Sequence, residues 1–344
     1  MSNPVLTEAI DRVAGGEDLS ADEAARVLRE IMEGNAAETE TAAFLIALRT
    51  KGETVQEIAG LAATMRALAL PVRASGDLVD TAGTGGDGGK TFNISTAAAL
   101  VAAAAGAGVA KHGNRAVSSA SGSADVLEAL GFRLDLEPDR IAQGIDELGF
   151  GFLFAPTHHP AMRHAAPVRR ELAARTVFNV LGPLTNPAGA RAQVVGVYAP
   201  GLVRTIADVL ALLGARRAFV VHGAEGIDEL SPAGPNLVCE VVDGDVRERE
   251  IDPLDLGVPR CAPEELRGGS PDDNARAIRE VFAGGNGGRR DAILLNAAGA
   301  IAAGGHAGDL VEGLAIARET VASGAAATRL EALVEFTRVE RVEA

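Results

Sequence analysis

The apolar pattern of this chain changes near residue 76, and that change limits the fold more than any other feature. Before it, residues 1–70 carry apolar side chains at the three- and four-residue spacing of helices. Gly34 and Gly52 stand where such helices would end, and Pro71 closes the region. The helices are expected at residues 18–33, 38–50 and 54–69.

After residue 76, short apolar runs alternate with stretches rich in Ala and Leu. The runs expected to be strands are 78–79, 194–198, 218–222 and 292–295, and the expected helices are 95–105, 124–130 and 202–213. Such alternation is typical of an α/β sheet covered by helices. We therefore predict the α/β class, with a small all-helical N-terminal domain at 1–72 and a larger α/β domain at 73–344. Residues 160–187 look helical again, and we expect them to join the N-terminal domain.

Charge and composition narrow the possible ligands. The 344 residues include 47 acidic and 32 basic side chains, a net charge of -15, with 3% aromatic residues and no Trp. Binding to nucleic acid or to an anionic membrane is therefore disfavoured. A phosphate ligand would need a local basic cluster, oriented backbone amides or a divalent cation.

Cysteine content and apolar runs indicate the compartment. The two cysteines, Cys239 and Cys261, form no CxxC pattern, which argues against a disulfide scaffold and a zinc site. The first residues show no signal-peptide pattern. The longest apolar run, 97–110, is too short to span a bilayer. We expect a soluble cytoplasmic protein.

A glycine-rich segment, residues 80–90, lies between an expected strand and an expected helix. Glycines there let backbone N–H groups converge on an anion beside a helix N-terminus. Gly83, Gly85 and Gly88 satisfy the dinucleotide pattern, yet residues 97–110 lack the acid which that pattern requires. Asp87 would repel a bare pyrophosphate, so a sugar hydroxyl or a metal-bound phosphate is favoured. A tight turn without a ligand is the alternative.

Two further polar segments follow. In residues 91–96, Ser95 or Thr96 is expected to cap the next helix, or to offer its hydroxyl to a phosphate or Mg²⁺. Residues 111–119 bring together two cations, an imidazole, an amide and two hydroxyls, which favours an anion site over a solvated loop. Gly122 or Ser123 would begin the helix at 124–130.

The remaining candidates are a basic segment and an acidic pair. Residues 158–175 include Arg163, Arg169, Arg170 and Arg175 against one acid, and a solvent-exposed helix face is the alternative for Arg163 and Arg170. Residues 178–187 are interpreted as a structural turn. Asp228 and Glu229 follow an expected strand and suit Mg²⁺, although such pairs are also common on acidic surfaces.

In this order, the motifs closely resemble those of the anthranilate phosphoribosyltransferase family. The most specific are the Gly-Thr-Gly-Gly-Asp run at 83–87 and the Lys-His-Gly-Asn-Arg run at 111–115; those at 93–96, 182–187 and 228–229 agree, as does the segment 42–49. The resemblance covers nearly the whole chain. Pyrimidine nucleoside phosphorylases, which share the fold, carry Lys-His-Ser in place of the second run.

The resemblance implies the nucleoside phosphorylase/phosphoribosyltransferase-like fold, with the active site in the cleft between the two domains. It implies small-molecule substrates, Mg²⁺ as cofactor, and a homodimer formed through the helical domain. The implied reaction transfers the 5-phosphoribosyl group of 5-phosphoribosyl 1-diphosphate (PRPP) to the amine of anthranilate, releasing diphosphate, in tryptophan biosynthesis. The alternatives are a pyrimidine nucleoside phosphorylase and a non-catalytic relative that binds nucleic acid.

The family's site residues map onto this sequence by motif. The sugar-diphosphate loop would use Gly83, Gly86, Asp87 and Thr91, and the diphosphate would lie against Asn93, Ile94, Ser95 and Thr96. The phosphoribosyl group would contact Lys111, His112, Gly113, Asn114, Arg115, Ala116, Val117, Ser118, Ser119 and Ser123. Anthranilate would contact Asn114 and Arg169, which with Lys111 are the expected catalytic residues. Mg²⁺ would be held by Ser95, Asp228 and Glu229. Ala120 departs from the family, which often has Lys there.

Overall fold

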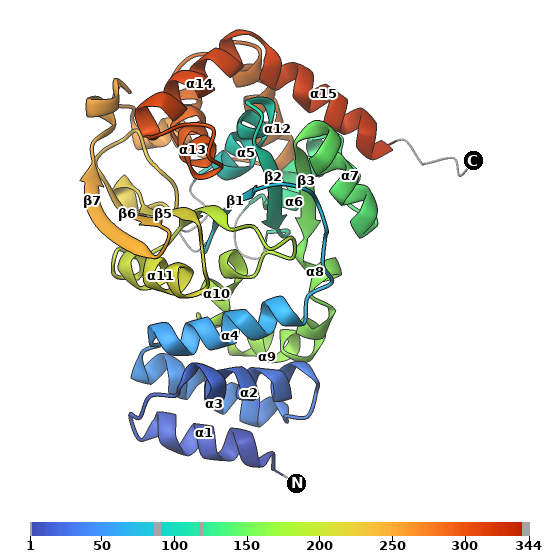
Figure 1. Cartoon of the computed structure of the whole chain (residues 1–344), viewed down its shortest axis with the longest axis vertical. Helices are drawn as coiled ribbons and strands as arrows, with labels where there is room; N and C mark the ends of the chain where they lie inside the picture. Colours follow the sequence, from blue (N-terminus) through green and yellow to red (C-terminus); the bar gives the residue numbers. More distant parts are fainter. Residues whose placement is uncertain (1, 86–90, 117–119, 339–344) are drawn as a thin grey trace.

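The computed structural model describes residues 2–85, 91–116 and 120–338, and it has two parts. Four helices form the smaller part at the lower end of Figure 1: α1 (Pro4–Ala14), α2 (Ala21–Met32), α3 (Glu38–Lys51) and α4 (Val55–Ala67). The larger part is a sheet with helices on both faces, so the predicted α/β class with a helical N-terminal block is confirmed. No described helix is long and apolar enough to cross a membrane.

Local sequence signals explain where the N-terminal helices begin and how they pack. Ser20 and Thr54 cap α2 and α4, and each forms a capping box with a glutamate three residues later. One of these glutamates, Glu57, is completely buried and pairs with Lys51 at 3.0 Å. Gly60 lets α4 approach α2 closely, because a Cβ there would lie 2.1 Å from the carbonyl oxygen of Ala21.

The sheet has seven strands in the order β3-β2-β1-β4-β5-β6-β7. The strands are β1 (Leu78–Gly83), β2 (Gly108–Gly113), β3 (Phe150–Phe154), β4 (Ala192–Gly196), β5 (Arg217–His222), β6 (Asn236–Val242) and β7 (Asp245–Ile251). β1 to β5 pair in parallel, and β6 and β7 add an antiparallel hairpin at one edge. The strand order reverses between β1 and β4, which is where open α/β sheets form a crevice at the carboxyl ends of their strands.

Helices cover the two faces of the sheet. One face packs on α5 (Ile94–Ala104), α13 (Gly288–Ala303) and the helices around them, which are α6 (Ser123–Leu130), α12 (Pro271–Phe282), α14 (Leu310–Ala322) and α15 (Ala325–Arg338). The other face packs on α7 (Pro138–Leu148) and on α11 (Gly201–Leu212), which in turn contacts α4 (Figure 1). Residues alternate along the strands: Ala218 and Val220 face α11, and Phe219 and Val221 face the opposite core.

The segment after β3 returns to the helical block through short helical turns. These are α8 (Ala155–His158), η1 (Pro160–His164), α9 (Ala166–Leu172), α10 (Phe178–Leu181) and η2 (Gly182–Leu184). Val168 and Phe178 lie in the same buried cluster as the N-terminal helices, and α9 contacts α3. The segment therefore links the helical block to the sheet.

The predicted strand at 292–295 is wrong, because those residues lie inside α13. That helix is buried on nearly all sides from Asp291 to Ala303, so its apolar residues are continuous and do not recur every three or four positions. A short apolar run of this kind cannot be distinguished from a buried strand by periodicity. The strands expected at 78–79 and 218–222 lie in β1 and β5, and 194–198 overlaps β4 but extends past its end.

Candidate active site

The switch point of the sheet is closely covered by the loop that carries the acidic pair. β1 ends at Gly83 and β4 ends at Gly196. A Cβ on Gly196 would lie 1.6 Å from the carbonyl oxygen of Asp228, and one on Gly83 would lie 2.2 Å from its Oδ2. The backbone N–H of Gly85 donates to the same Oδ2 at 2.8 Å. Glycine is therefore required where these strands end, because a side chain at Gly196 would meet the Asp228 backbone and one at Gly83 would meet its carboxylate.

The acidic pair is not part of a freely solvated surface. Asp228 is buried, and Glu229 is half-buried with its Oε1 accepting the backbone N–H of Ser95 at 3.1 Å. Burial and the neighbouring Asp228 carboxylate raise the pKa of Glu229 to about 8. The side chain of Asn296 on α13 anchors the loop after Glu229 by two hydrogen bonds to Leu230. Its Nδ2 donates to the carbonyl oxygen at 2.8 Å, and its Oδ1 accepts the backbone N–H at 2.9 Å. Two carboxylates so close together favour a bound cation.

The N-terminus of α5 lies beside the acidic pair and carries polar side chains. Its N-cap is Asn93, so the expectation that Ser95 or Thr96 caps the helix is wrong; both lie inside its first turn. The Asn93 side chain forms no capping bond. The Thr96 hydroxyl oxygen is buried and has no hydrogen-bond partner among the described residues. The start of an 11-residue helix with an unpaired hydroxyl is suited to an anion.

A buried cation and a buried acid lie beneath the strand ends. Lys111 of β2 is 2% exposed, and its Nζ donates to the carbonyl oxygen of Thr81 on β1. Burial lowers the pKa of Lys111, while attraction to Asp80 and Glu229 opposes the shift. Burial likewise raises the pKa of Asp80 to about 6, although Lys111 and the Nδ2 of Asn186, 2.8 Å away, favour the ionised carboxylate. Lys111 is therefore a desolvated cation among acids, below the start of α5.

His112 is held in one orientation. Its Nδ1 donates to the carbonyl oxygen of Gly182 at 3.1 Å, and its backbone N–H donates to Asp80 at 3.1 Å. Its ring centroid lies 5.1 Å from that of His159, and burial lowers the pKa of His112 to about 3. The Nε2 is buried without a partner in the described part of the chain. The 178–187 segment, interpreted from sequence as structural, thus supports the site through Gly182 and Asn186.

The end of the Lys-His-Gly-Asn-Arg run is held by the helix that follows. Gly113 lies so close to Ser123 that a Cβ there would be 2.2 Å from the hydroxyl oxygen. Asn114 is exposed, and its carbonyl oxygen accepts the Ser123 hydroxyl at 3.2 Å. The Arg115 guanidinium is paired with Asp125 at 3.1 Å and with Glu128. Its charge is therefore already partly neutralised, whereas Asn114 remains accessible.

Arg169 differs from the other arginines of its segment. It lies on α9, half-buried, with its guanidinium 5.1 Å from the ring centroid of Phe178. Burial lowers its pKa, and no carboxylate pairs with it among the described residues. Arg163 and Arg170 are exposed. Phe178 begins the α10–η2 segment, and Gly182 of that segment accepts the His112 hydrogen bond, so one segment contacts both Arg169 and His112.

Several of the residues predicted to bind substrate have side chains or backbone groups that are buried or already hydrogen-bonded. Ile94 is completely buried in the core, so only its backbone can face a ligand. The backbone N–H of Ala116 donates to Asp125 at 2.9 Å. The remaining candidates lie outside the described residues, namely Gly86, Asp87, Val117, Ser118 and Ser119.

Sequence reasoning missed residues that lie beneath or beside the site. Asp80 and Asn186 lie within the segments 80–90 and 182–187 but were given no role in the site, and Asn296 lies outside every motif; all three are buried polar groups. Segment 266–269 was given no role in the site, yet it pairs with Thr91 and Phe92: the Phe92 N–H donates to the carbonyl of Leu266 at 3.0 Å. The apolar context of Asp80, at the centre of a strand, is the one signal that could have revealed it.

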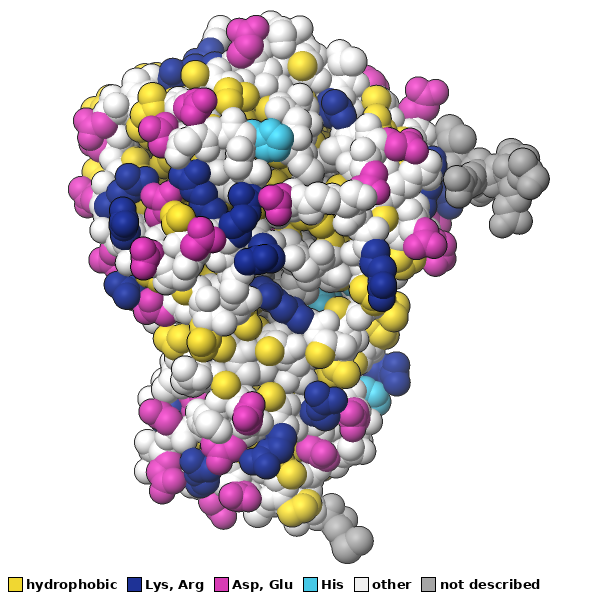
Figure 2. Space-filling view, in the orientation of Figure 1, with side chains coloured by type: hydrophobic (Ala, Val, Ile, Leu, Met, Phe, Trp, Pro, Cys, Tyr) yellow, Lys and Arg dark blue, Asp and Glu magenta, His cyan; other side chains and the backbone are white. Residues whose placement is uncertain are grey.

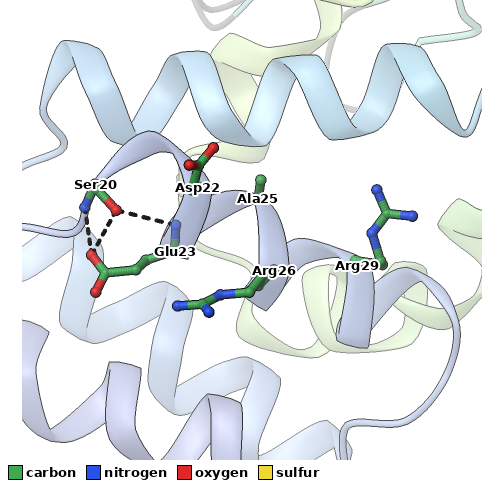
Figure 3. A pocket seen from close by; sticks show the side chains of 6 residues that line it. All are labelled: Ser20, Asp22, Glu23, Ala25, Arg26 and Arg29. Carbon is green, nitrogen blue, oxygen red and sulfur yellow. Dashed lines mark hydrogen bonds between the residues drawn. The ribbon is translucent and has the colours of Figure 1, made fainter.

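The molecular surface is hollowed above the waist that joins the two parts of the molecule (Figure 2). Figure 2 shows several Lys and Arg side chains around the hollow above the narrow waist, in a protein with an excess of acids. A separate, open groove on α2 is lined by Ser20, Asp22, Glu23, Ala25, Arg26 and Arg29 (Figure 3). It contains none of the predicted site residues, and its Glu23 is engaged by Ser20 and Arg12.

Comparison with known proteins gives a consistent result. Residues 75–327 match the α/β domain model of a glycosyl transferase family, and residues 7–69 match its helical bundle domain. Anthranilate phosphoribosyltransferase from Rubrobacter xylanophilus is 55% identical, with 98% of each chain covered. The corresponding protein from Pelotomaculum thermopropionicum is 52% identical, with 97% of each covered.

Solved structures agree with the sequence matches. The crystal structure of anthranilate phosphoribosyltransferase from Thermus thermophilus superposes with a TM-score of 0.91 at 49% identity, covering 96% of this chain and 99% of that one. The Saccharomyces cerevisiae enzyme in complex with PRPP and Mg superposes with a TM-score of 0.88 at 29% identity, covering 98% of each chain.

Proposed function

This chain belongs to the anthranilate phosphoribosyltransferase family, and we propose that it transfers the 5-phosphoribosyl group of PRPP to the amine of anthranilate. The products are N-(5-phosphoribosyl)anthranilate and diphosphate, and the reaction belongs to tryptophan biosynthesis. One observation supports this function above the others. The start of α5, the buried Lys111 and the Asp228–Glu229 pair meet where the strand order reverses.

Each of these groups has a role in binding a sugar diphosphate. The start of α5 attracts the anion through its helix dipole and the Thr96 hydroxyl. The backbone N–H groups of Ile94 and Ser95 are already engaged, by Phe92 and by Glu229. Departure of diphosphate leaves positive charge on the ribose C1 and negative charge on the leaving group. Lys111 stabilises that negative charge from a buried position, where an ammonium group has a stronger effect than in water. The glycine-rich run, with Gly83, Gly86, Asp87 and Thr91, completes this subsite in the proposal.

The acidic pair fits a magnesium ion. The described residues contain no group of three or more His, Cys, Asp or Glu side chains arranged to hold a metal. Two carboxylates and the Ser95 hydroxyl nevertheless match the way Mg²⁺ is bound, through one or two carboxylates together with substrate phosphates and water. Burial and the Asp228 carboxylate raise the pKa of Glu229 in spite of the nearby Lys111, and a bound cation would favour the ionised carboxylate. The chemistry that a bound ion supplies is neutralisation of diphosphate charge.

Anthranilate requires a carboxylate receptor, and Arg169 meets this requirement. Its guanidinium is half-buried, unpaired with a carboxylate among the described residues, and located beside the Phe178 ring. A planar guanidinium can bond both oxygens of a carboxylate while the aromatic ring of the acceptor packs nearby. The exposed Asn114 would orient the amine from the other side. Because an aromatic amine is a weak nucleophile, positioning by these two residues contributes much of the rate.

The turnover assay follows the fluorescence of anthranilate with PRPP and Mg²⁺, since the absence of Trp keeps protein emission low. We expect a decay that requires all three components. Phosphorolysis of uridine or thymidine by inorganic phosphate, without anthranilate turnover, would identify a pyrimidine nucleoside phosphorylase instead. Absence of both activities beside an active control enzyme would favour the non-catalytic alternative.

The proposal includes a homodimer through the helical block and a cytoplasmic location, with the active site between that block and the α/β part. Ile46, on α3, is a large apolar side chain that is 37% exposed and is available for such an interface. Light scattering after size exclusion should give twice the 35.1 kDa chain mass. Ile46→Glu should shift the mass toward that of one chain.

A further inference from the structure

The Asn93 side chain is held in an arrangement that its position in the helix does not require. Asn is among the best N-cap residues, and a capping bond stabilises a helix by about 1 kcal/mol. Asn93 is the N-cap of α5, yet its carboxamide makes no capping bond. It turns instead toward two other segments, which contain Ser121 and Asn274.

Three hydrogen bonds determine which end of this carboxamide is oxygen. The Oδ1 of Asn93 accepts the Ser121 hydroxyl at 3.0 Å and the Nδ2 of Asn274 at 2.9 Å. The Nδ2 of Asn93 donates to the carbonyl oxygen of Ser121 at 3.1 Å. A reversed amide would place donor against donor at Asn274 and acceptor against acceptor at the Ser121 carbonyl. The observed orientation leaves the second amide proton of Asn93 without an acceptor among the described residues.

Asn274 is the most buried member of this network. It is 3% exposed, in the first part of α12, and its Oδ1 accepts the backbone N–H of Gly269 at 2.8 Å. Ser270 caps α12 in a capping box with Asp273. Ser121, by contrast, is half-buried in the loop that precedes α6.

The segment beside Asn274 is itself joined to the approach to Asn93. Gly268 lies against Thr91, where a Cβ would be 2.5 Å from the Thr91 carbonyl oxygen. Thr91 also forms an isolated antiparallel bridge with Arg267. Asn274 therefore connects α12, segment 266–269 and the start of α5 through a single buried carboxamide.

We propose that Asn274 is a positioning residue for PRPP: it directs the N–H end of Asn93 toward the diphosphate without touching the substrate. This inference rests on the proposed function, in which Asn93 binds the diphosphate. An amide donor aimed at a phosphate gives a charge-assisted hydrogen bond, whereas a reversed amide presents oxygen to an anion. Loss of Asn274 should therefore weaken PRPP binding specifically.

Asn274→Asp tests this role, because it retains the acceptor for Gly269 and removes the donor to Asn93. We expect the KM for PRPP to rise on the order of tenfold, the size of one charge-assisted bond, while the KM for anthranilate changes less than about twofold. Asn274→Ser removes the same donor without adding charge and should shift the KM for PRPP in the same direction.

Asn3→Asp is the matched control. Like Asn274, Asn3 is a buried asparagine whose Nδ2 donates to a residue distant in the sequence, Glu30, at 2.7 Å. It caps α1, which lies at the end of the molecule opposite to α12 (Figure 1). We expect this variant to lose thermal stability while both KM values remain those of the parent. If it raises the KM for PRPP as much as the Asn274 variants do, a general loss of stability explains the effect and the proposal is wrong.

A double-mutant cycle asks whether Asn274 acts through Asn93. Calorimetry should measure PRPP binding in the presence of Mg²⁺ for Asn93→Ala, Asn274→Asp and the double variant. We expect the double variant to bind no more weakly than Asn93→Ala alone; additive losses would overturn the proposal. Because this binding measurement needs no anthranilate, it tests the role of Asn274 even if the chain does not use anthranilate as a substrate. A failure of the proposed function can therefore be distinguished from a failure of the inference about Asn274.

Discussion

Replacing Arg169 by Met separates its contribution to binding from its cost to stability. The guanidinium is half-buried beside Phe178, burial lowers its pKa, and no carboxylate neutralises it among the described residues. A bidentate bond from such a group to the anthranilate carboxylate is worth about 2 kcal/mol. Its loss should raise the KM for anthranilate about thirtyfold, since 1.4 kcal/mol is about a factor of ten.

The same substitution should not weaken the fold. An unpaired cation in a partly buried position is costly, and Met fills similar space beside an aromatic ring. We expect the free energy of unfolding without substrate to stay the same or to rise by up to about 1 kcal/mol. Opposite changes in binding and stability are typical of a residue retained for function.

The assay measures initial rates by anthranilate fluorescence, varying each substrate while the other is saturating, with thermal unfolding recorded on the same samples. Arg170→Met is the matched control, because Arg170 is the next residue on α9 and is exposed. It should change neither KM. Equal rises in both KM values for Arg169→Met, or the same effect from Arg170→Met, would refute the role assigned to Arg169.

Three further predictions concern the strand ends and the buried imidazole. The double substitution Asp228→Asn, Glu229→Gln should lower kcat at least about a hundredfold at the Mg²⁺ concentration of the ordinary assay; retained turnover would contradict the metal assignment. It should also raise the melting temperature without Mg²⁺, because burial and the Asp228 charge raise the folded-state pKa of Glu229 to about 8 and so make its ionisation unfavourable in the fold. Gly83→Ala should displace the Asp228 carboxylate, 2.2 Å from the new Cβ, and raise the Mg²⁺ concentration for half-maximal rate about tenfold, as a Mg²⁺ titration would show. His112→Asn should reduce the loss of folding stability that acid causes. Burial lowers the pKa of His112 in the folded protein to about 3, compared with about 6.5 in the unfolded chain. Between these two pH values the unfolded chain binds more protons than the folded one, so the free energy of unfolding falls as the pH falls. Urea unfolding from pH 6.5 to 4 should show the smaller slope in the variant, and identical slopes would contradict it.

Elements with strong local signals could be predicted from the sequence. Gly34 and Gly52, where helices were expected to stop, adopt positive φ angles of 79° and 94°. The expected helix at 124–130 corresponds to α6, which begins one residue earlier at Ser123. Such features depend on a few neighbouring residues, so a single chain is sufficient to reveal them.

Elements whose identity depends on distant packing could not be predicted. α13 was interpreted in part as a strand because its surroundings, rather than its own pattern, bury it on all sides. The N-cap of α5 was assigned to Ser95 or Thr96, whereas Asn93 occupies it with its side chain engaged by Asn274, 181 residues away along the chain. No local pattern contains that information.

The candidate site divides in the same way. Lys111, His112 and the Asp228–Glu229 pair stood out by residue type. Their environment did not: the burial of Lys111, the contact of Glu229 with Ser95, and the glycines that admit Asp228 are products of the sheet order. Sequence thus indicated which groups to examine, and the parallel strands explain why they meet.

The most direct test of this account is the position of the metal in crystals grown with PRPP and Mn²⁺, a substitute for Mg²⁺ with a measurable anomalous signal. We predict an anomalous peak between the carboxylates of Asp228 and Glu229 and the diphosphate, beside Ser95 at the start of α5. A peak bound elsewhere, or PRPP bound away from the ends of β1 and β4, would contradict the central claim that the sheet's switch point is the active site.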